Sequence, residues 1–201
     1  MPETMTNTRK LAHIAILSTL SFLLMYLQFP LIPSASFLLF DFSILPVLVG
    51  LVMIDLQSAL GILILRTLLK LMLNNGGVTT LIGMPMNVVA LGVFLLAMAF
   101  IWNRKPSLKT FVLASVVGMI GLTVAMLVLN YIYAVPLYAQ FANFDISAIL
   151  GLGNYLFAMV VPFNLIEGVI FSISFFILWT CLKPILLITE TMIISYQKLR
   201  V

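Results

Sequence analysis

Residues 110–144 read TFVLASVVGMIGLTVAMLVLNYIYAVPLYAQFANF, a run of 35 residues without Asp, Glu, Lys or Arg. About 20 apolar residues are enough to cross the hydrocarbon core of a bilayer. Two further uncharged runs, residues 11–40 and 71–103, contain 30 and 33 residues. A buried helix of a soluble domain is shorter than any of these runs. The sequence therefore predicts an integral membrane protein.

The composition of the whole chain supports this prediction and excludes several classes of protein. Of the 201 residues, 63% are hydrophobic and 8% are charged, whereas soluble domains carry roughly 25% charged residues. With one cysteine (Cys181) and one histidine (His13), we expect no internal disulfide and no clustered metal site. We find no nucleophile–base pair, no paired carboxylates and no phosphate-binding loop, so we expect neither an enzyme nor a catalytic cofactor.

Proline, glycine, asparagine and charged residues divide the chain into six hydrophobic segments. We predict helices over residues 10–28, 42–54, 56–73, 83–102, 108–133 and 155–182. They would form one all-α, six-transmembrane-helix domain over residues 1–182, followed by a cytoplasmic or interfacial tail over residues 183–201. Pro30 should stop the first helix, because proline restricts the residue before it to extended backbone. Residues 31–40, interrupted by Pro33, should form a loop folded back onto the protein.

The basic residues predict the orientation of the bundle. Eight of the ten lie on one side of a six-helix arrangement: Arg9, Lys10, Arg104, Lys105, Lys109, Lys183, Lys198 and Arg200. Cytoplasmic loops of membrane proteins are enriched in Lys and Arg, so we expect both termini in the cytoplasm. This placement also explains the net charge of +4. The basic residues lie at the cytoplasmic surface of the membrane, so no nucleic-acid partner is needed to account for them.

Three charged residues are expected inside the membrane, where such residues are costly and mark functional sites. Arg66 and Lys70 are four residues apart and therefore share one face of the third helix. Glu167 lies deep in the sixth helix, at a depth similar to that of Arg66. Two interpretations remain open and are compatible with each other. The charges could form a structural Arg66–Glu167 pair, or they could line a cavity that opens outward.

Amides and aromatic rings extend the set of candidate ligand-binding residues. Asn87, Asn130 and Asn164 each offer donors and an acceptor in one plane, which suits the edge of a flat heterocycle, although each could equally bond a neighbouring helix. Aromatic residues could sandwich a ring system: Phe37, Phe40 and Phe42 in the loop, and Tyr131. Asp41, which together with Ser43 is a candidate cap of the second helix, completes the set.

Small residues recur along one side of the first helix. Ala12, Ala15, Ser18 and Thr19 would let another helix approach closely. We therefore take Ala12, Ala15 and Thr19 as a candidate partner-docking face.

Several ordered motifs resemble one known family over essentially the whole chain. These are Arg9-Lys10, Phe29-Pro-Leu-Ile-Pro33, Asp41-Phe-Ser-Ile-Leu-Pro46, Gly83-Met-Pro-Met-Asn-Val-Val-Ala-Leu-Gly92, Leu129-Asn-Tyr-Ile-Tyr-Ala-Val-Pro-Leu-Tyr138 and Val161-Pro-Phe-Asn-Leu-Ile166. They are similar to the riboflavin-specific S components of energy-coupling factor (ECF) vitamin transporters. The resemblance implies a six-helix S-component fold in a bacterial cell membrane. It also implies a riboflavin site facing outward, a lid formed by the first loop, and assembly with the transmembrane coupling protein EcfT and two ECF ATPases.

The same resemblance assigns roles to individual residues. Asn130 and Asn164 match amides that hydrogen-bond the isoalloxazine ring. Many relatives carry a lysine where this chain has Glu167, so that contact cannot be transferred, and Arg66 or Lys70 could compensate for it. The family's Ala-xxx-Ala coupling element is represented by Ala15 and Thr19.

Other functions remain as alternatives at this point. The chain could be an S component for thiamine or folate. FMN could also be a ligand in addition to riboflavin. An autonomous carrier or channel belongs to a different class, and the lack of internal repeats argues against a carrier.

Overall fold

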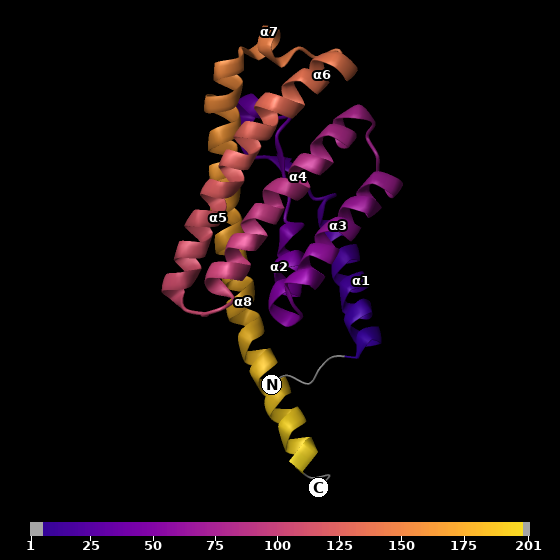
Figure 1. Cartoon of the computed structure of the whole chain (residues 1–201), viewed down its shortest axis with the longest axis vertical. Helices are drawn as coiled ribbons and strands as arrows, with labels where there is room; N and C mark the ends of the chain where they lie inside the picture. Colours follow the sequence, from indigo (N-terminus) through magenta and orange to yellow (C-terminus); the bar gives the residue numbers. More distant parts are fainter. Residues whose placement is uncertain (1–5, 199–201) are drawn as a thin grey trace.

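Long apolar helices dominate the fold, as the uncharged runs predict. The structure is a computed structural model (Figure 1) that describes residues 6–198, and side chains for residues 6–184. The elements in chain order are α1 (Asn7–Leu24), β1 (Phe29–Pro30), η1 (Pro33–Ala35), β2 (Leu39–Phe40), α2 (Ile44–Met53), α3 (Leu56–Leu73), α4 (Val78–Ala97), η2 (Met98–Trp102), α5 (Leu108–Leu129), η3 (Asn130–Ala134), α6 (Val135–Phe141), α7 (Ile146–Leu150), η4 (Asn154–Val160) and α8 (Val161–Lys198). The segment η1 is a 3₁₀ turn, whereas η2, η3 and η4 are π-helical.

Four continuous helical segments are long and apolar enough to cross a membrane. They are Leu56–Leu73, Val78–Trp102, Leu108–Phe141 and Asn154–Pro184. The shorter α2 has ten apolar residues, and α1 has 18 residues but begins with a polar turn that contains Arg9 and Lys10. The prediction of an all-α protein with membrane-spanning helices is confirmed.

Several helices differ in extent from the predicted segments. Helix α1 ends at Leu24 rather than at residue 28, because the chain already turns there before Phe29 and Pro30 enter β1. Helix α4 begins at Val78, five residues earlier than predicted, because Gly77 completes the preceding turn with φ of 81°, which glycine adopts without strain. Helix α8 continues through Pro184 to Lys198, so residues 183–198 of the predicted tail extend the last helix, and residues 199–201 lie outside the described residues.

The π-helical segments η3 and η4 each lie just before a proline. A proline ring clashes with the carbonyl group four residues earlier, which belongs to Ile132 for Pro136 and to Ala158 for Pro162. Those two residues lie inside η3 and η4 respectively. The wider π-helical turns accommodate each proline, and the α5–η3–α6 and η4–α8 segments remain continuous.

The loop between α1 and α2 is folded back onto the bundle. Strands β1 and β2 pair in antiparallel register, with Phe29 opposite Phe40 and Pro30 opposite Leu39. The side chains of Ala35 and Phe40 are fully buried. Ala35 packs in a cluster with Tyr155 and other residues of α7 and η4, so the loop covers one end of the last helical segment.

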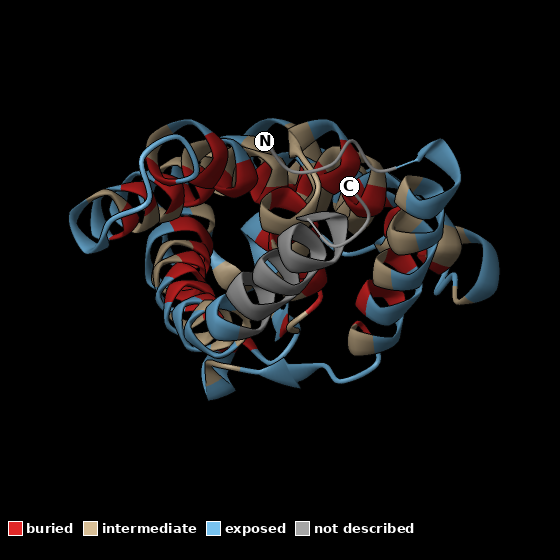
Figure 2. Ribbon diagram, turned by 90° about the horizontal axis from the view of Figure 1, so that it is seen from below, coloured by how far each residue is buried: buried red, intermediate tan, exposed pale blue. Residues whose placement is uncertain are grey.

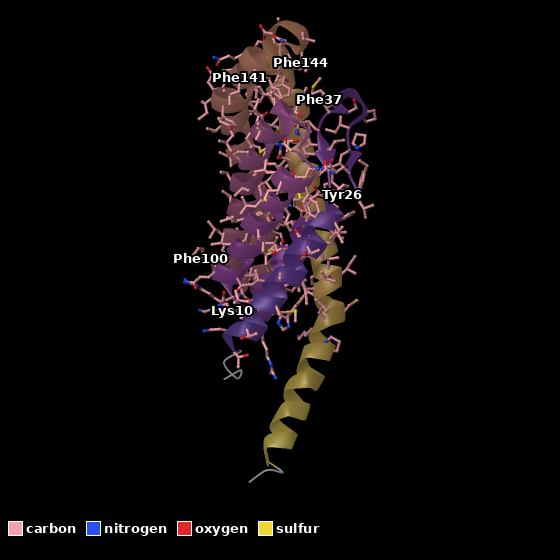
Figure 3. The ribbon with its side chains drawn as sticks, turned by 90° about the vertical axis from the view of Figure 1, so that its right-hand side faces the viewer. Lys10, Tyr26, Phe37, Phe100, Phe141 and Phe144 are labelled. Carbon is pink, nitrogen blue, oxygen red and sulfur yellow. The ribbon has the colours of Figure 1, made fainter. Side chains whose placement is uncertain are left out.

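The two ends of the bundle differ in character. One end, here called the basic end, carries the start of α1 and the α4–α5 turn, with Lys10 and Phe100 (Figures 1 and 3). The opposite end, the loop end, carries the α3–α4 turn, α7 and the β1–β2 loop with Phe37. Buried residues face the interior of the bundle, and exposed residues lie around its outside (Figure 2).

At the basic end, one ion pair joins α1 to α3. The Nζ atom of Lys10 lies 2.6 Å from Oδ2 of Asp55. Asp55 is also the N-cap of α3, and its Oδ1 accepts a hydrogen bond from the backbone N–H of Ser58 at 2.7 Å. The first helix is thereby fixed to the α2–α3 turn.

Candidate functional site

A fully buried arginine lies at the centre of a polar cluster in the bundle. Arg66 of α3 donates from Nη1 to Oγ of Ser43 and from Nη2 to Oδ1 of Asn87 on α4. Its Nε atom is buried and has no hydrogen-bond partner among residues 6–184, whose side chains the structure describes. A buried donor left without a partner is costly, so this atom marks a position where a ligand group or water could accept a hydrogen bond.

Ser43 connects this arginine to the rest of the cluster. Its backbone N–H donates to Oδ1 of Asp41 at 2.8 Å, and its carbonyl accepts from Oγ of Ser21 on α1 at 2.5 Å. Ser43 is the residue before α2, but its side chain makes no capping bond, because its hydroxyl group accepts from Arg66. Through Ser43, the end of the β1–β2 loop is bonded to α1 and α3.

The direct Arg66–Glu167 ion pair considered from the sequence is not formed. Within the part of the chain with described side chains, the only salt bridge joins Lys10 to Asp55. Within the same residues, neither Asp41 nor Glu167 forms a salt bridge with Arg66. Glu167 is buried. The guanidinium group is thus held by neutral partners, with the two carboxylates farther away.

Lys70 lies one turn beyond Arg66 on α3 and is also buried. Its Nζ atom is 5.5 Å from the centroid of the Tyr26 ring, at the end of α1. Such cation–π contacts contribute about 0.5–1 kcal/mol at exposed sites and more when desolvated. Lys70 therefore joins α3 to the beginning of the β1–β2 loop segment.

The two predicted flavin-binding amides, Asn130 and Asn164, are both buried, but their hydrogen-bond partners differ. Asn164 on α8 donates from Nδ2 to the carbonyl of Val160 at 2.7 Å, and its Oδ1 is buried without a partner in the described part of the chain. Asn130, the first residue of η3, donates from Nδ2 to the carbonyl of Met126 at 2.8 Å. Its Oδ1 accepts from Oη of Tyr155 at 2.5 Å. Asn164 thus presents a free acceptor, whereas Asn130 is held by a tyrosine.

The predicted aromatic residues differ in their burial. Phe42 is partly buried, and its ring lies 4.9 Å from that of the buried Phe40. Phe37 is 48% exposed, and its ring lies 6.1 Å from that of the buried Tyr155. Tyr131 is 58% exposed and lines an outer apolar groove of about 430 Å³ with residues of α5 and η4. The ring of Tyr131 is therefore not in the interior beside Asn130.

The small residues of α1 lie on an outward-facing surface. Ala12, Ala15 and Thr19 are exposed. Ala15 and Thr19 line a shallow groove of about 400 Å³ together with Ile16, Leu20 and Leu23. Ser18, the fourth small residue of this series, is fully buried and lies about 100° around the helix from Thr19, on the side that faces the bundle.

Sequence reasoning missed Tyr155, Ser21 and the bonding role of Ser43. Serine and tyrosine are ordinary residues in membrane helices, so their types gave no signal. The prolines at 136 and 162 did carry a signal for local distortion of the helices that contain Asn130 and Tyr155. Single π-helical turns inside α-helices occur frequently at functional sites.

The Arg66 network, the Asn130–Tyr155 pair and Asn164, here together called the buried polar cluster, offer buried donors and acceptors from several helices, and the β1–β2 loop packs over Tyr155. A few placed polar groups within apolar surroundings are typical of sites that bind small molecules. Within the described residues, no group of three or more His, Cys, Asp or Glu side chains could hold a metal ion. The arrangement is suited to binding.

Comparison with known proteins gives consistent results. A family model described as "ECF transporter, substrate-specific component" matches residues 9–179. The chain is 64% identical over 182 residues to the riboflavin transporter RibU of Streptococcus thermophilus, covering 90% of this chain and 86% of that protein. It is 40% identical over 187 residues to RibU of Leuconostoc mesenteroides, covering 90% and 94% of the two chains.

A solved structure extends the likeness to three dimensions. It is described as the S component of a bacterial ECF transporter and aligns with a TM-score of 0.74 at 25% sequence identity. The alignment covers 90% of this chain and 99% of that structure.

Proposed function

The chain belongs to the family of substrate-specific components of ECF transporters, and from this premise we propose that it is the high-affinity riboflavin-binding subunit of a vitamin importer. The observation that carries the proposal is the 64% identity to a riboflavin transporter over 90% of the chain. The chain is a multi-pass membrane protein and a subunit of a transporter. It is not an enzyme. Riboflavin is its transported ligand rather than a catalytic cofactor.

The proposed topology has six membrane segments, with α1 and α2 added to the four long helical segments. Both termini then lie in the cytoplasm of a bacterial cell. The support for this orientation is the position of Arg9, Lys10, Arg104, Lys105 and Lys109, all at the basic end. The loop end faces outward and receives the vitamin. Residues 1–182 act as one membrane domain, and residues 183–201 continue on the cytoplasmic side.

The proposed binding site lies within the buried polar cluster. Its candidate residues are Asn130, Asn164, Asn87, Asp41, Phe37, Phe42, Arg66, Lys70 and Glu167. Riboflavin is an uncharged tricycle with a polyhydroxyl chain, so a mostly apolar site with a few fixed polar groups suits it. The unpartnered Nε of Arg66 and Oδ1 of Asn164 supply one donor and one acceptor. Tyr131 is left out of the set because more than half of its side chain is exposed.

The proposed partners are the transmembrane coupling protein EcfT and two ECF ATPases. The chain contributes capture of the vitamin, and the ATPases supply the energy for import. The α1 surface formed by Ala12, Ala15 and Thr19 is the proposed contact with the coupling protein. Small side chains on an exposed helix face let a second helix approach to backbone distance.

Titration of the purified chain with riboflavin, followed by quenching of flavin fluorescence, tests the proposal. We expect saturable one-to-one binding that is not displaced by thiamine or folate. FMN is included to determine whether a phosphorylated flavin also binds. Binding of thiamine or folate in preference to riboflavin would contradict the proposed ligand.

A further inference from the structure

Two distorted helical segments meet inside the bundle at one hydrogen bond. Asn130 begins η3, and Tyr155 is the second residue of η4. The Oη atom of Tyr155 donates to Oδ1 of Asn130 at 2.5 Å, and both side chains are buried. Since π-helical turns shift the direction of side chains relative to a regular helix, the two segments together place these groups in contact.

The bond to Tyr155 fixes an otherwise soft side chain. The terminal torsion of an asparagine is broad, and its amide can rotate at little cost. In Asn130, one amide N–H donates to the carbonyl of Met126, and one acceptor position of Oδ1 is taken by Tyr155. An asparagine amide has two donors and two acceptor positions. One donor and one acceptor therefore remain for a ligand, in an orientation set by the two bonds.

The ring of Tyr155 has a second contact, with the covering loop. Phe37 lies against it with 6.1 Å between ring centroids and an interplanar angle of 31°. Figure 3 shows Phe37 at the loop end, opposite to Lys10 and Phe100. Ala35 of the same loop packs in the cluster that contains Tyr155. Tyr155 thus contacts the loop with its ring and the amide with its hydroxyl group.

We propose that Tyr155 is a positioning residue for flavin binding: its hydroxyl group orients the Asn130 amide, and its ring supports the loop that covers the site. This inference rests on the proposed riboflavin-binding function and adds a residue that acts through Asn130. Loop closure and amide orientation share one side chain. Displacement of the loop at Phe37 therefore also lets the Asn130 amide, which hydrogen-bonds the ligand, rotate more freely.

Tyr155→Phe separates the two roles, because it keeps the ring that contacts Phe37 and removes the bond to Asn130. We expect riboflavin binding about two- to tenfold weaker, the range for loss of one buried hydrogen bond, with the change mainly in the dissociation rate. Tyr138→Phe is the matched control. Tyr138 is a half-buried neighbour whose hydroxyl makes no hydrogen bond within the described residues, and this variant should bind within twofold of the parent chain.

A double-mutant cycle tests whether the effect passes through Asn130. In an Asn130→Ala background, Tyr155→Phe should change the affinity by less than about twofold, whereas in an Asn164→Ala background it should keep its full effect. A purely structural role of Tyr155 would weaken binding equally in both backgrounds and would overturn the inference. So would unchanged affinity of Tyr155→Phe. If the parent chain itself failed to bind riboflavin, the proposed function would be wrong, and this measurement is made first.

Discussion

Arg66 of α3 donates a hydrogen bond to the side chain of Ser43, the last residue before α2. The arginine is fully buried, so its charge is held in place by this hydroxyl group and by the Asn87 amide rather than by an adjacent carboxylate. Ser43 in turn bonds Asp41 at the end of the covering loop and Ser21 on α1. The position of the loop is therefore linked to α1 and α3 through one serine.

Ser43→Ala removes a single hydroxyl group but should destabilise the protein clearly. The substitution removes a partner of a buried guanidinium N–H, which leaves that donor unsatisfied at a cost of roughly 1–3 kcal/mol. Thermal unfolding of the purified protein in detergent measures the loss. Ser36→Ala, at an exposed serine of the same loop, is the control and should leave the unfolding temperature unchanged. Equal behaviour of the two variants would mean that Ser43 does not hold Arg66.

Glu167→Gln and Arg66→Met should have opposite consequences for stability. Arg66→Met removes two buried hydrogen bonds and leaves the Ser43 hydroxyl and the Asn87 amide oxygen without this donor, at a cost of roughly 1–3 kcal/mol for each unsatisfied group. Glu167 makes no salt bridge within the described residues. Replacing a buried, unpaired carboxylate by a neutral amide should therefore leave stability unchanged or raise it. Similar losses of unfolding temperature in both variants would indicate a direct pair in the membrane.

Asn164→Ala should weaken riboflavin binding. Among the residues whose side chains the structure describes, the buried Oδ1 of Asn164 has no hydrogen-bond partner, so a ligand N–H or hydroxyl group is its expected donor. Losing that acceptor should cost roughly 1–3 kcal/mol, or about 5- to 150-fold in affinity, as measured by flavin titration. Asn154→Ala is the matched control because Asn154 is exposed. An affinity unaffected by Asn164→Ala would remove this residue from the site.

The Lys10–Asp55 pair should make a small, acid-sensitive contribution to stability. Burial raises the pKa of Asp55, but the hydrogen bonds from Lys10 and Ser58 outweigh it, and the pKa is lowered overall. A carboxylate with a lowered pKa in the folded state stabilises at pH values above its unfolded pKa, and this contribution is lost as the pH falls through the folded value.

Asp55→Asn should therefore be less stable than the parent chain at neutral pH. Both side chains are partly exposed, so the ion pair itself is worth about 0.2–1 kcal/mol. The difference in unfolding temperature should shrink below about pH 4, near the unfolded pKa of aspartate. A difference that stays constant from pH 7 to pH 3 would show that the charge of Asp55 is not responsible.

Ala15→Leu should separate vitamin capture from import. Ala15 lies on the exposed face of α1, away from the buried polar cluster, so flavin titration of the isolated variant should match the parent chain. Uptake of radiolabelled riboflavin by cells should fall, because the larger side chain blocks close approach of a partner helix. Ala139→Leu, at an exposed alanine of α6, is the control and should leave uptake intact. Normal uptake with Ala15→Leu would dismiss this surface as the contact.

Helical class and membrane insertion were predictable because they depend on local composition. A run of 35 uncharged and mostly apolar residues is well beyond the length of about 20 residues that spans a bilayer. Helix ends were predictable only to within a few residues: α1 ends four residues before its predicted end, and α4 begins five residues before its predicted start, at the turn that Gly77 completes. The partners of Arg66 were not, because Ser43 and Asn87 lie on other elements and neither type is distinctive. Depth alone suggested Glu167 as the partner of Arg66, and tertiary packing placed two neutral residues closer.

The π-helical segment at Asn130 has a consequence for how sequences of this kind can change. A π-helical turn holds about one residue more than an α-helical turn, and one residue corresponds to about 100° of rotation around a helix. Deleting one residue from η3 would let α5 and α6 join as a regular helix, while moving either Asn130 or Pro136 to a different face. Single-residue insertions and deletions here should therefore be rare among functional relatives, and where one occurs, a compensating change is expected in η4.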